Sequence, residues 1–290
     1  MILKRSIILL AGGAVLLLAA LTSAAFAGGG SKASEPVGAQ SRSVDTFSKA
    51  SDKPTIVLVH GAWADASSWS GEVERLQRDG YVVRAIDNPL RGLDNDVEEV
   101  KDFLSTITGP IVLVGHSYGG SVITNAAAGN TNVKALVYVD AAAPDVGETT
   151  GQLSGSTSAL NADPATLFDN VLYAGAPSGA TQLYLKENIF VHDFAQDLPV
   201  RTAERLWATQ RPAAMAAFDT PSDAAAWKTI PSWYVIGLDD KIITPASEMA
   251  MAQRAHSHIL EVRGGSHLTL VSHPDAVTNQ ILAAARSVQP

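Results

Sequence analysis

The sequence predicts an α/β protein built on a mostly parallel, doubly wound sheet. Short apolar runs rich in Val, Ile and Leu recur along the chain, and such runs are typical of strands buried on both faces. Segments with helical periodicity lie between these runs. Because strands that alternate with helices form parallel sheets covered on both faces, this rhythm predicts the class. One long stretch without apolar strands interrupts it and indicates an insertion.

Four apolar strands and their helices are predicted before the interruption. The strands cover 55–59, 81–87, 111–115 and 133–140. A helix over 68–78 ends at Gly80, since glycine adopts the left-handed conformation of a helix end at little cost. Asp94 or Asp96 is expected to cap the next helix, which runs to about Leu104. A further helix begins at Gly120.

The interruption covers about 145–229. It contains short amphipathic pieces, such as 202–209, and scattered aromatic residues. Aromatic residues at this density favour a helical cap over a pocket, rather than a plain surface insertion. The sheet then resumes, with strands over 232–237 and 259–263 and helices over about 246–255 and 274–286. Residues 54–290 therefore suit one α/β domain with an inserted cap.

The sequence Gly115-His116-Ser117-Tyr118-Gly119 joins a predicted strand to the next predicted helix. G-x-S-x-G at such a junction is the pattern of a nucleophile elbow. A sharp turn leaves little room for side chains, so glycine stands on both sides of the serine. The free N–H groups and the positive end of the helix dipole point to the same place. Ser117 is therefore the candidate nucleophile.

Four motifs resemble the α/β-hydrolase family. They are His60-Gly61-Ala62-Trp63, the elbow just described with Gly120 after it, Asp239-Asp240-Lys241 and Gly264-Gly265-Ser266-His267. They are most similar to the branch that includes plant methylesterases, hydroxynitrile lyases and bacterial small-ester hydrolases. The resemblance covers the chain after residue 53. It implies the α/β-hydrolase fold, with the cap inserted after the sixth strand.

A serine hydroxyl needs a base within hydrogen-bond reach, and the base needs a carboxylate that fixes its tautomer. The family order of serine, acid and histidine is met by Ser117, Asp240 and His267, each just beyond a predicted strand. The family places the acid directly before Lys or Arg, which selects Asp240. Asp239 and then Asp140, at the end of an earlier strand, are the alternatives.

The oxyanion of a tetrahedral intermediate needs two N–H donors. The resemblance implies the backbone of Tyr118, directly after the nucleophile, and of Ala62. Trp63 is a candidate pocket wall, although it could serve only to pack its loop, as expected for Trp69. His192, in the cap, is a second candidate for the pocket. The spacing of the histidines matches no known metal motif, so neither a metal nor another cofactor is expected.

The predicted function is hydrolysis of a small carboxylic ester or lactone through an acyl-enzyme intermediate. The first alternative is a lyase of the hydroxynitrile kind. Those enzymes carry Thr in place of Gly61 and Lys directly after the catalytic histidine, where this chain has Leu268. Both departures favour ester hydrolysis. The second alternative is a protein that binds a small molecule without turnover.

The first 27 residues resemble a secretory signal peptide. A basic start, Lys4-Arg5, precedes an apolar stretch over 7–21 and then Ala25-Phe26-Ala27, after which cleavage is predicted. The alternative is a membrane anchor, but an apolar core of about 15 residues is short for a span that needs about 20. Residues 28–53 are rich in Gly, Ser and Ala and are expected to be a disordered leader. These features predict a secreted or periplasmic protein that has no membrane contact after signal removal.

Composition narrows the partners. The formal net charge is −8 and no basic run occurs, which argues against nucleic acid as a partner. The chain has no Cys, so export would involve no disulfides. The expected partner is a small ester. The sequence leaves open its acyl and alcohol groups and the oligomeric state of the protein.

Overall fold

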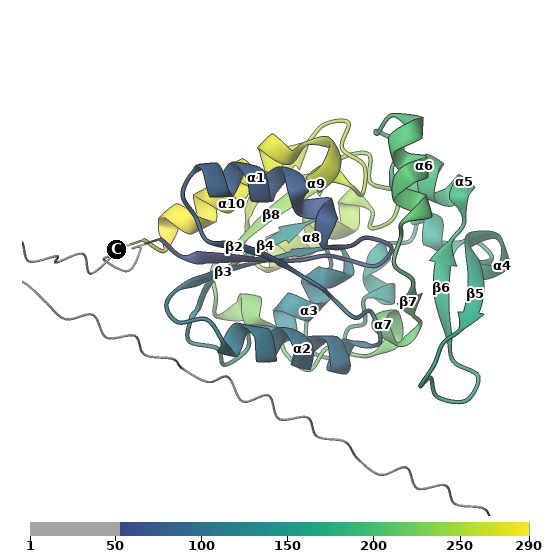
Figure 1. Ribbon diagram of the computed structural model, residues 1–290, viewed down its shortest axis with the longest axis horizontal. Coiled ribbons are helices and arrows are strands. Elements are labelled where there is room, and N and C mark those ends of the chain that lie inside the picture. The colour runs from purple at the N-terminus through teal and green to yellow at the C-terminus, as the bar shows by residue number, and fades with distance from the viewer. Residues whose placement is uncertain (1–52, 290) are drawn as a thin grey trace, which may run out of the picture. The chain divides into compact units, whose positions relative to one another are not determined.

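The structure, a computed structural model, describes residues 53–289 (Figure 1). The predicted signal peptide over 1–27 and, except for Lys53, the predicted leader over 28–53 lie outside the described residues, so both stay predictions. The described part of the chain consists of a main sheet with its covering helices and an inserted cap.

The main sheet has six strands, and every neighbouring pair is parallel. The strand order is β2-β1-β3-β4-β8-β9. This confirms the α/β class and the parallel sheet. In chain order the strands are β1 (Thr55–Val59), β2 (Val83–Ile86), β3 (Ile111–His116), β4 (Val133–Val139), β8 (Ser232–Gly237) and β9 (His258–Val262).

Helices cover both faces of this sheet. Figure 1 shows α1 (Ser70–Arg78) and α10 (Pro274–Ser287) on one face, and α2 (Leu93–Ser105) and α3 (Tyr118–Ala126) on the other. Strand β3 is buried along its whole length, as expected for a central strand that no water reaches on either side. The remaining helices outside the cap are η1 (Ala66–Trp69), α8 (Pro245–Arg254), which packs against β8, and α9 (Thr269–Ser272).

The predicted cap of α2 was wrong. The helix begins at Leu93, after Gly92 with φ 146°, and neither Asp94 nor Asp96 lies at the cap position. Asp96 turns inward and is fully buried. Its carboxylate accepts hydrogen bonds from the Arg91 N–H at 3.0 Å and from the Tyr118 hydroxyl at 2.7 Å. A contact with the elbow helix, which sequence does not show, therefore takes the place of the local cap.

The cap lies between β4 and β8 and is not entirely helical. Three of its segments form an antiparallel sheet in the order β5-β6-β7. These strands are β5 (Phe168–Leu172), β6 (Thr181–Leu185) and β7 (Ala213–Ala214). The helical elements are η2 (Gly151–Ser154), η3 (Ala159–Asn161), α4 (Pro164–Leu167), α5 (Glu187–Ile189), η4 (Phe190–Phe194), α6 (Val200–Ala208), α7 (Ala216–Asp219) and η5 (Ala226–Lys228).

Two details of the cap therefore differ from expectation. Strand β5 is mostly exposed and β6 is only partly buried, and neither carries a long apolar run, so periodicity did not reveal them. The cap also follows the fourth strand of the main sheet among residues 53–289, where the resemblance implied the sixth. The predicted position counted strands of the family that were not identified in this chain.

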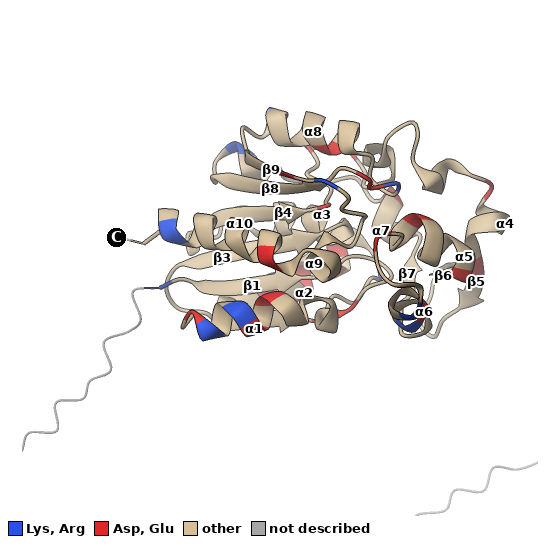
Figure 2. Cartoon of the chain, turned by 90° about the horizontal axis from the view of Figure 1, so that it is seen from above, with Lys and Arg blue, Asp and Glu red and all other residues tan. Residues whose placement is uncertain are grey.

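Charged residues are dispersed over the described elements. In Figure 2, Lys and Arg lie on separate helices such as α1, α6 and α10, with Asp and Glu between them. This arrangement agrees with the absence of basic runs from the sequence. Among residues 53–289, every helix is too short or too polar to cross a membrane.

Candidate active site

Ser117 lies at a strained turn between β3 and α3. Its backbone has φ 53° and ψ −125°, a region that residues other than glycine rarely adopt. The turn is tightly packed, because a Cβ on Gly119 would lie 2.6 Å from the carbonyl oxygen of Val59. Glycine at this position lets the helix start directly against β1. The geometry is that of the nucleophile elbow that the motif predicts.

A buried chain of hydrogen bonds links Ser117 to His267 and Asp240. The Oγ of Ser117 lies 2.8 Å from Nε2 of His267, and Nδ1 of His267 lies 2.6 Å from Oδ2 of Asp240. The three residues come from three loops at the C-terminal edge of the sheet, after β3, β8 and β9. Ser117 is 6% exposed and His267 is fully buried.

Asp240 is oriented by the turn that contains it. Its other oxygen, Oδ1, accepts hydrogen bonds from the N–H groups of Ile242 at 2.6 Å and Ile243 at 3.1 Å. These donors favour the carboxylate form and leave Oδ2 directed at the imidazole. The following Lys241 reaches away from the triad and pairs with Asp193 of the cap at 3.0 Å.

The structure separates the three candidate acids. Asp239 is exposed, and its N–H and carbonyl groups bind Gly265 and Gln196 instead of the imidazole. Asp140 is fully buried, but its carboxylate accepts hydrogen bonds from the N–H groups of Gly237 and Thr269, both at 3.0 Å. Of the three, Asp240 alone contacts His267.

The environment of His267 keeps its imidazole neutral. Burial lowers the pKa of His267 from 6.5 to about 3. The ring of Phe194, from the cap, meets the imidazole edge to face with centroids 4.9 Å apart. A neutral imidazole with Nδ1–H donated to Asp240 has Nε2 free to accept a proton from Ser117.

The two predicted oxyanion donors flank Ser117. Tyr118 is the first residue of α3, so its N–H has no carbonyl partner one turn earlier. Within residues 53–289 the N–H of Ala62 has no hydrogen-bond partner either. Gly61 permits the close approach of this loop, because a Cβ there would lie 2.5 Å from the Cβ of Ser117. Both N–H groups are thus available beside the serine.

The cavity beside Ser117 has a volume of about 200 Å³. Trp63 forms one wall, as predicted, and its ring is stacked between Phe168 at 5.6 Å and Phe218 at 5.4 Å. The indole N–H donates to the carbonyl of Leu183 at 2.9 Å, which fixes the ring against the cap. The other lining residues are Thr150, Gly151, Ser154, Leu160, Asn161, Pro164, Met215, Asp219, Ile242 and Ile243.

Sequence reasoning missed most of this wall and misplaced one residue. His192 is exposed and is not part of the lining, so its expected place in the pocket was wrong. In the π-helical turn of η4, Phe190 and Phe194 are buried while His192 is exposed, but neither phenylalanine lines this cavity. The aromatic content of the cap was the available signal for Phe168 and Phe218, but the sequence does not show that β5 and α7 carry these two rings to the pocket.

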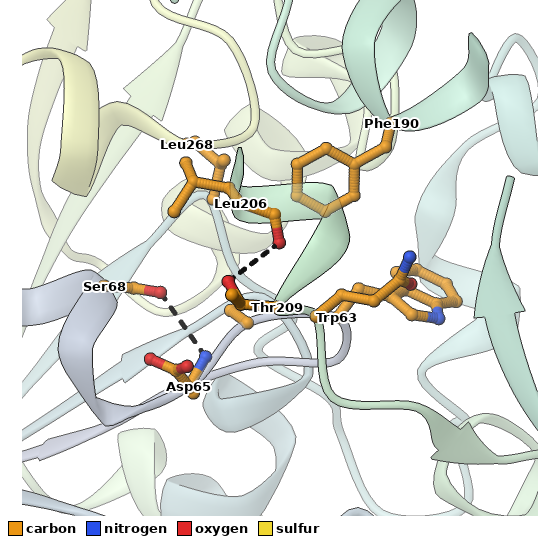
Figure 3. A pocket seen from close by; sticks show the side chains of 9 residues that line it. Trp63, Asp65, Ser68, Phe190, Leu206, Thr209 and Leu268 are labelled. Carbon is orange, nitrogen blue, oxygen red and sulfur yellow. Dashed lines mark hydrogen bonds between the residues drawn. The ribbon is translucent and has the colours of Figure 1, made fainter. Parts of the chain in front are cut away.

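Trp63 also borders a second, much smaller cavity (Figure 3). Phe190, Leu206, Thr209 and Leu268 lie around it, and its volume is about 10 Å³. That space suits about one water molecule and no substrate. The 200 Å³ cavity is therefore the one that can hold a ligand next to Ser117.

These features are those of the α/β hydrolases as a class: a parallel sheet, an elbow that places a serine between a strand and a helix, and an inserted cap. Residues 56–280 match the family described as "Alpha/beta hydrolase family". "Alpha/beta hydrolase nvfD" of Aspergillus novofumigatus is 30% identical over 258 residues, which cover 80% of this chain and 97% of that protein. The chain belongs to the α/β-hydrolase family.

One further relative and one solved structure are similar to this chain. "Pimeloyl-[acyl-carrier protein] methyl ester esterase" of Xanthomonas campestris pv. campestris is 27% identical over 79% of this chain and 93% of that protein. A solved structure, an extracellular α/β-hydrolase from a Paenibacillus species with homology to tobacco salicylic acid binding protein 2, aligns with a TM-score of 0.67. It covers 80% of this chain and 99% of that one, at 22% identity, which shows the shared fold.

Proposed function

We propose that the protein hydrolyses small carboxylic esters or lactones, with Ser117 as nucleophile, His267 as general base and Asp240 as the acid that orients it. The hydrogen-bonded chain from Asp240 through His267 to Ser117 carries this proposal. Esterases among the relatives support the reaction class.

In the proposed first step, Oγ of Ser117 attacks the ester carbonyl while Nε2 of His267 takes the hydroxyl proton. The N–H groups of Ala62 and Tyr118 donate to the oxygen that becomes negatively charged. His267 then gives its proton to the departing alcohol, and the acyl group stays on Ser117. In the second step His267 takes a proton from water, the hydroxide attacks the acyl group, and the acid leaves as Ser117 recovers its proton.

The cavity supports a neutral, largely apolar substrate. Its walls are mostly aromatic and aliphatic, with polar side chains at Thr150, Ser154 and Asn161, and among the described residues neither Lys nor Arg lines it. A volume of about 200 Å³ suits a small acyl or aryl group more than a long chain. Among the described residues, Asp219 is the one charged residue in the lining, and its exposed carboxylate would repel an anionic substrate.

The structure bears on the lyase alternative through Gly61. A threonine there would place its Cβ 2.5 Å from Ser117, so this loop is built for glycine. Leu268, in the position where those lyases carry Lys, is buried and supplies no charge to the pocket. The sequence departures that favour ester hydrolysis therefore have a steric and an electrostatic basis.

Replacing the nucleophile tests the proposed function and separates it from binding without turnover. Ser117→Ala should remain folded, lower kcat on p-nitrophenyl esters by about a million-fold and abolish labelling by a fluorophosphonate. Ser105→Ala, which changes an exposed serine at the end of α2, is the control and should keep full activity. Labelling that persists in Ser117→Ala would exclude Ser117, and wild-type protein that acylates without turnover would favour the binding protein.

We also propose export with cleavage after Ala27, from the basic start and apolar core of the first 27 residues. N-terminal sequencing of protein recovered outside the cytoplasm should give Gly28 as the first residue. Recovery of that material with Met1 intact would contradict cleavage.

A further inference from the structure

Three buried carboxyl groups lie together behind the proposed triad. Asp140 directly follows β4, Asp240 follows β8 and Glu248 lies on α8. One oxygen from each lies within 4.8 Å of the others. Asp140 and Glu248 are fully buried and Asp240 is 3% exposed. Water therefore does not screen the charges of this cluster.

The three groups differ in their hydrogen bonds. Asp140 accepts from the N–H of Gly237 and from both the N–H and the hydroxyl of Thr269. Asp240 accepts from two backbone N–H groups and from the imidazole of His267. The two oxygens of Glu248, in contrast, have no hydrogen-bond donor among the described residues. Asp140 and Asp240 thus have hydrogen-bond donors that stabilise an ionised carboxylate, whereas Glu248 has none among the described residues.

Among residues 53–289, no cation pairs with Glu248. Tyr234, on β8, donates its hydroxyl to the carbonyl of Ala141, and Arg254, farther along α8, binds Glu148 and the carbonyl of Ala143. Burial and the neighbouring Asp140 and Asp240 raise the pKa of Glu248 well above 4.5, and nothing lowers it. For the two aspartates, backbone N–H groups oppose the same rise in pKa.

We propose that Glu248 carries a proton at neutral pH and acts as a positioning residue for the proposed triad. A proton on Glu248 lowers the negative charge of the cluster and makes Glu248 an O–H donor to the neighbouring carboxylates. Asp240 can then stay ionised and accept the hydrogen bond from His267. The effect of Glu248 on catalysis rests on the proposed function, whereas the assignment of a proton to Glu248 does not.

A proton fits this cluster better than a metal ion. The oxygens of Asp140 and Asp240 already face N–H groups, which would point their positive ends at a bound cation. Cation sites present oxygen ligands whose lone pairs are free. Elemental analysis of the purified protein should therefore find no stoichiometric divalent ion, and finding one that Glu248→Gln loses would overturn the proposal.

Proton linkage tests the assignment without using activity. A carboxyl with a raised folded pKa releases its proton on unfolding, so stability falls as pH rises above about 4.5. Between pH 5.5 and 7.5, the unfolding constant of the wild type should rise about tenfold more per pH unit than that of Glu248→Gln. Equal pH dependence in the two proteins would show that Glu248 is ionised when folded and would overturn the proposal.

Glu72 supplies a matched control. It is also fully buried on α1, with two oxygens that lack a donor among the described residues, but it lies outside the cluster. Glu72→Gln should show the same change in proton linkage and an unchanged kcat. If Glu248→Gln fails to fold, infrared spectroscopy of Glu72→Gln at pH 7 replaces this test. That variant lacks the carboxyl of Glu72 but keeps Glu248, so it should still show the band of a protonated carboxyl. Absence of the band, or its loss in Glu72→Gln/Asp140→Asn, would overturn the proposal.

The positioning role is tested by rescue. Gln at 248 keeps an N–H donor in the place of the acid O–H, whereas Met fills a similar volume with none. Glu248→Gln should retain kcat within about threefold, and Glu248→Met should lose about tenfold or more. Equal kcat in the two variants would refute the positioning role. The proposed function is decided by whether Ser117→Ala loses activity, and the role of Glu248 by the comparison of Glu248→Gln with Glu248→Met. Failure of the proposed function and failure of the positioning role are therefore distinguishable.

Discussion

Asp197 of the cap accepts two hydrogen bonds from Ser266, the residue directly before His267. Its Oδ2 lies 3.0 Å from the backbone N of Ser266, and its Oδ1 lies 2.6 Å from the hydroxyl. The same hydroxyl accepts from the N–H of Leu268 at 3.1 Å. The inserted segment therefore fixes the loop that carries the proposed base, and the cap is more than a cover for the pocket.

Asp197→Ala should lower kcat on a small p-nitrophenyl ester by about tenfold or more. The loop loses both bonds to the cap, so the imidazole spends less time in line with Ser117. Asp169→Asn, which alters an exposed cap residue on β5, is the control and should have no effect. The rate of fluorophosphonate labelling measures the same change. An unaltered rate in Asp197→Ala would mean that the loop holds its shape without the cap.

The two adjacent acids should differ sharply. Asp240→Asn should reduce kcat by about 10⁴, because the amide removes the acceptor that fixes the tautomer of His267. Asp239→Asn should stay within about tenfold of the wild type, since its side chain is exposed and makes no bond to the imidazole. One ester assayed with both variants decides between them. An inactive Asp239→Asn would contradict the geometry described above.

The sheet and the proposed triad were predictable because each leaves a local signal. Buried parallel strands such as β3 are continuous apolar runs, and Ser117 and His267 lie in glycine-rich turns directly after strands. The choice of Asp240 needed the family resemblance, because Asp239 has the same chemistry one residue earlier. The hydrogen bonds from Ile242 and Ile243 that make the difference are visible only in the structure.

The features of the fold and site that could not be predicted depend on contacts between segments that are distant in the sequence. Asp96 looked like a helix cap, but the hydroxyl of Tyr118 draws it into the core. His192 looked like a pocket residue, but the π-helical turn of η4 leaves it exposed. The cap strands β5 and β6 pair with each other at the surface, so they lack the apolar runs that marked the main sheet. Local sequence carries no signal for such pairings.

Gly61→Ala should remove activity through a steric effect on the nucleophile. The added methyl group would lie 2.5 Å from Cβ of Ser117 and 2.8 Å from the carbonyl oxygen of His116, so the loop or the elbow must move. We expect at least about a hundredfold lower kcat/KM, since small displacements of reacting groups have large effects. Gly129→Ala is the control for a general effect of glycine loss: a Cβ there meets nothing within 4 Å, although the φ of 76° makes the backbone strained for alanine. Wild-type activity in Gly61→Ala would show that the loop tolerates a side chain.

The acid limb of the pH profile should lie below the ordinary pKa of histidine. His267 acts as a base only when neutral, and burial lowers its pKa from 6.5 to about 3. As pH falls, kcat/KM should therefore hold past pH 6.5 and decline at lower pH. Circular dichroism at each pH would separate this decline from unfolding. A midpoint above 6.5 in the folded protein would show that the charge of Asp240 outweighs burial.

Asp219 should select against anionic substrates. Within residues 53–289 it is the one charged residue that lines the cavity, and no Lys or Arg in that lining would balance a negative group on the ligand. For a pair of esters of equal size, one neutral and one bearing a carboxylate, the wild type should have the higher kcat/KM on the neutral ester. Because Asp219 is exposed and salt screens its charge, the contribution of this one residue should be only several-fold.

Asp219→Asn should accordingly raise kcat/KM for the anionic ester several-fold, mainly through KM, and leave the neutral ester unchanged. The gain should shrink as ionic strength rises. Asp223→Asn, a change on the loop before η5 outside this cavity, provides the matched loss of charge and should alter neither ester. Equal gains for both esters in Asp219→Asn would assign the effect to the shape of the pocket instead of its charge.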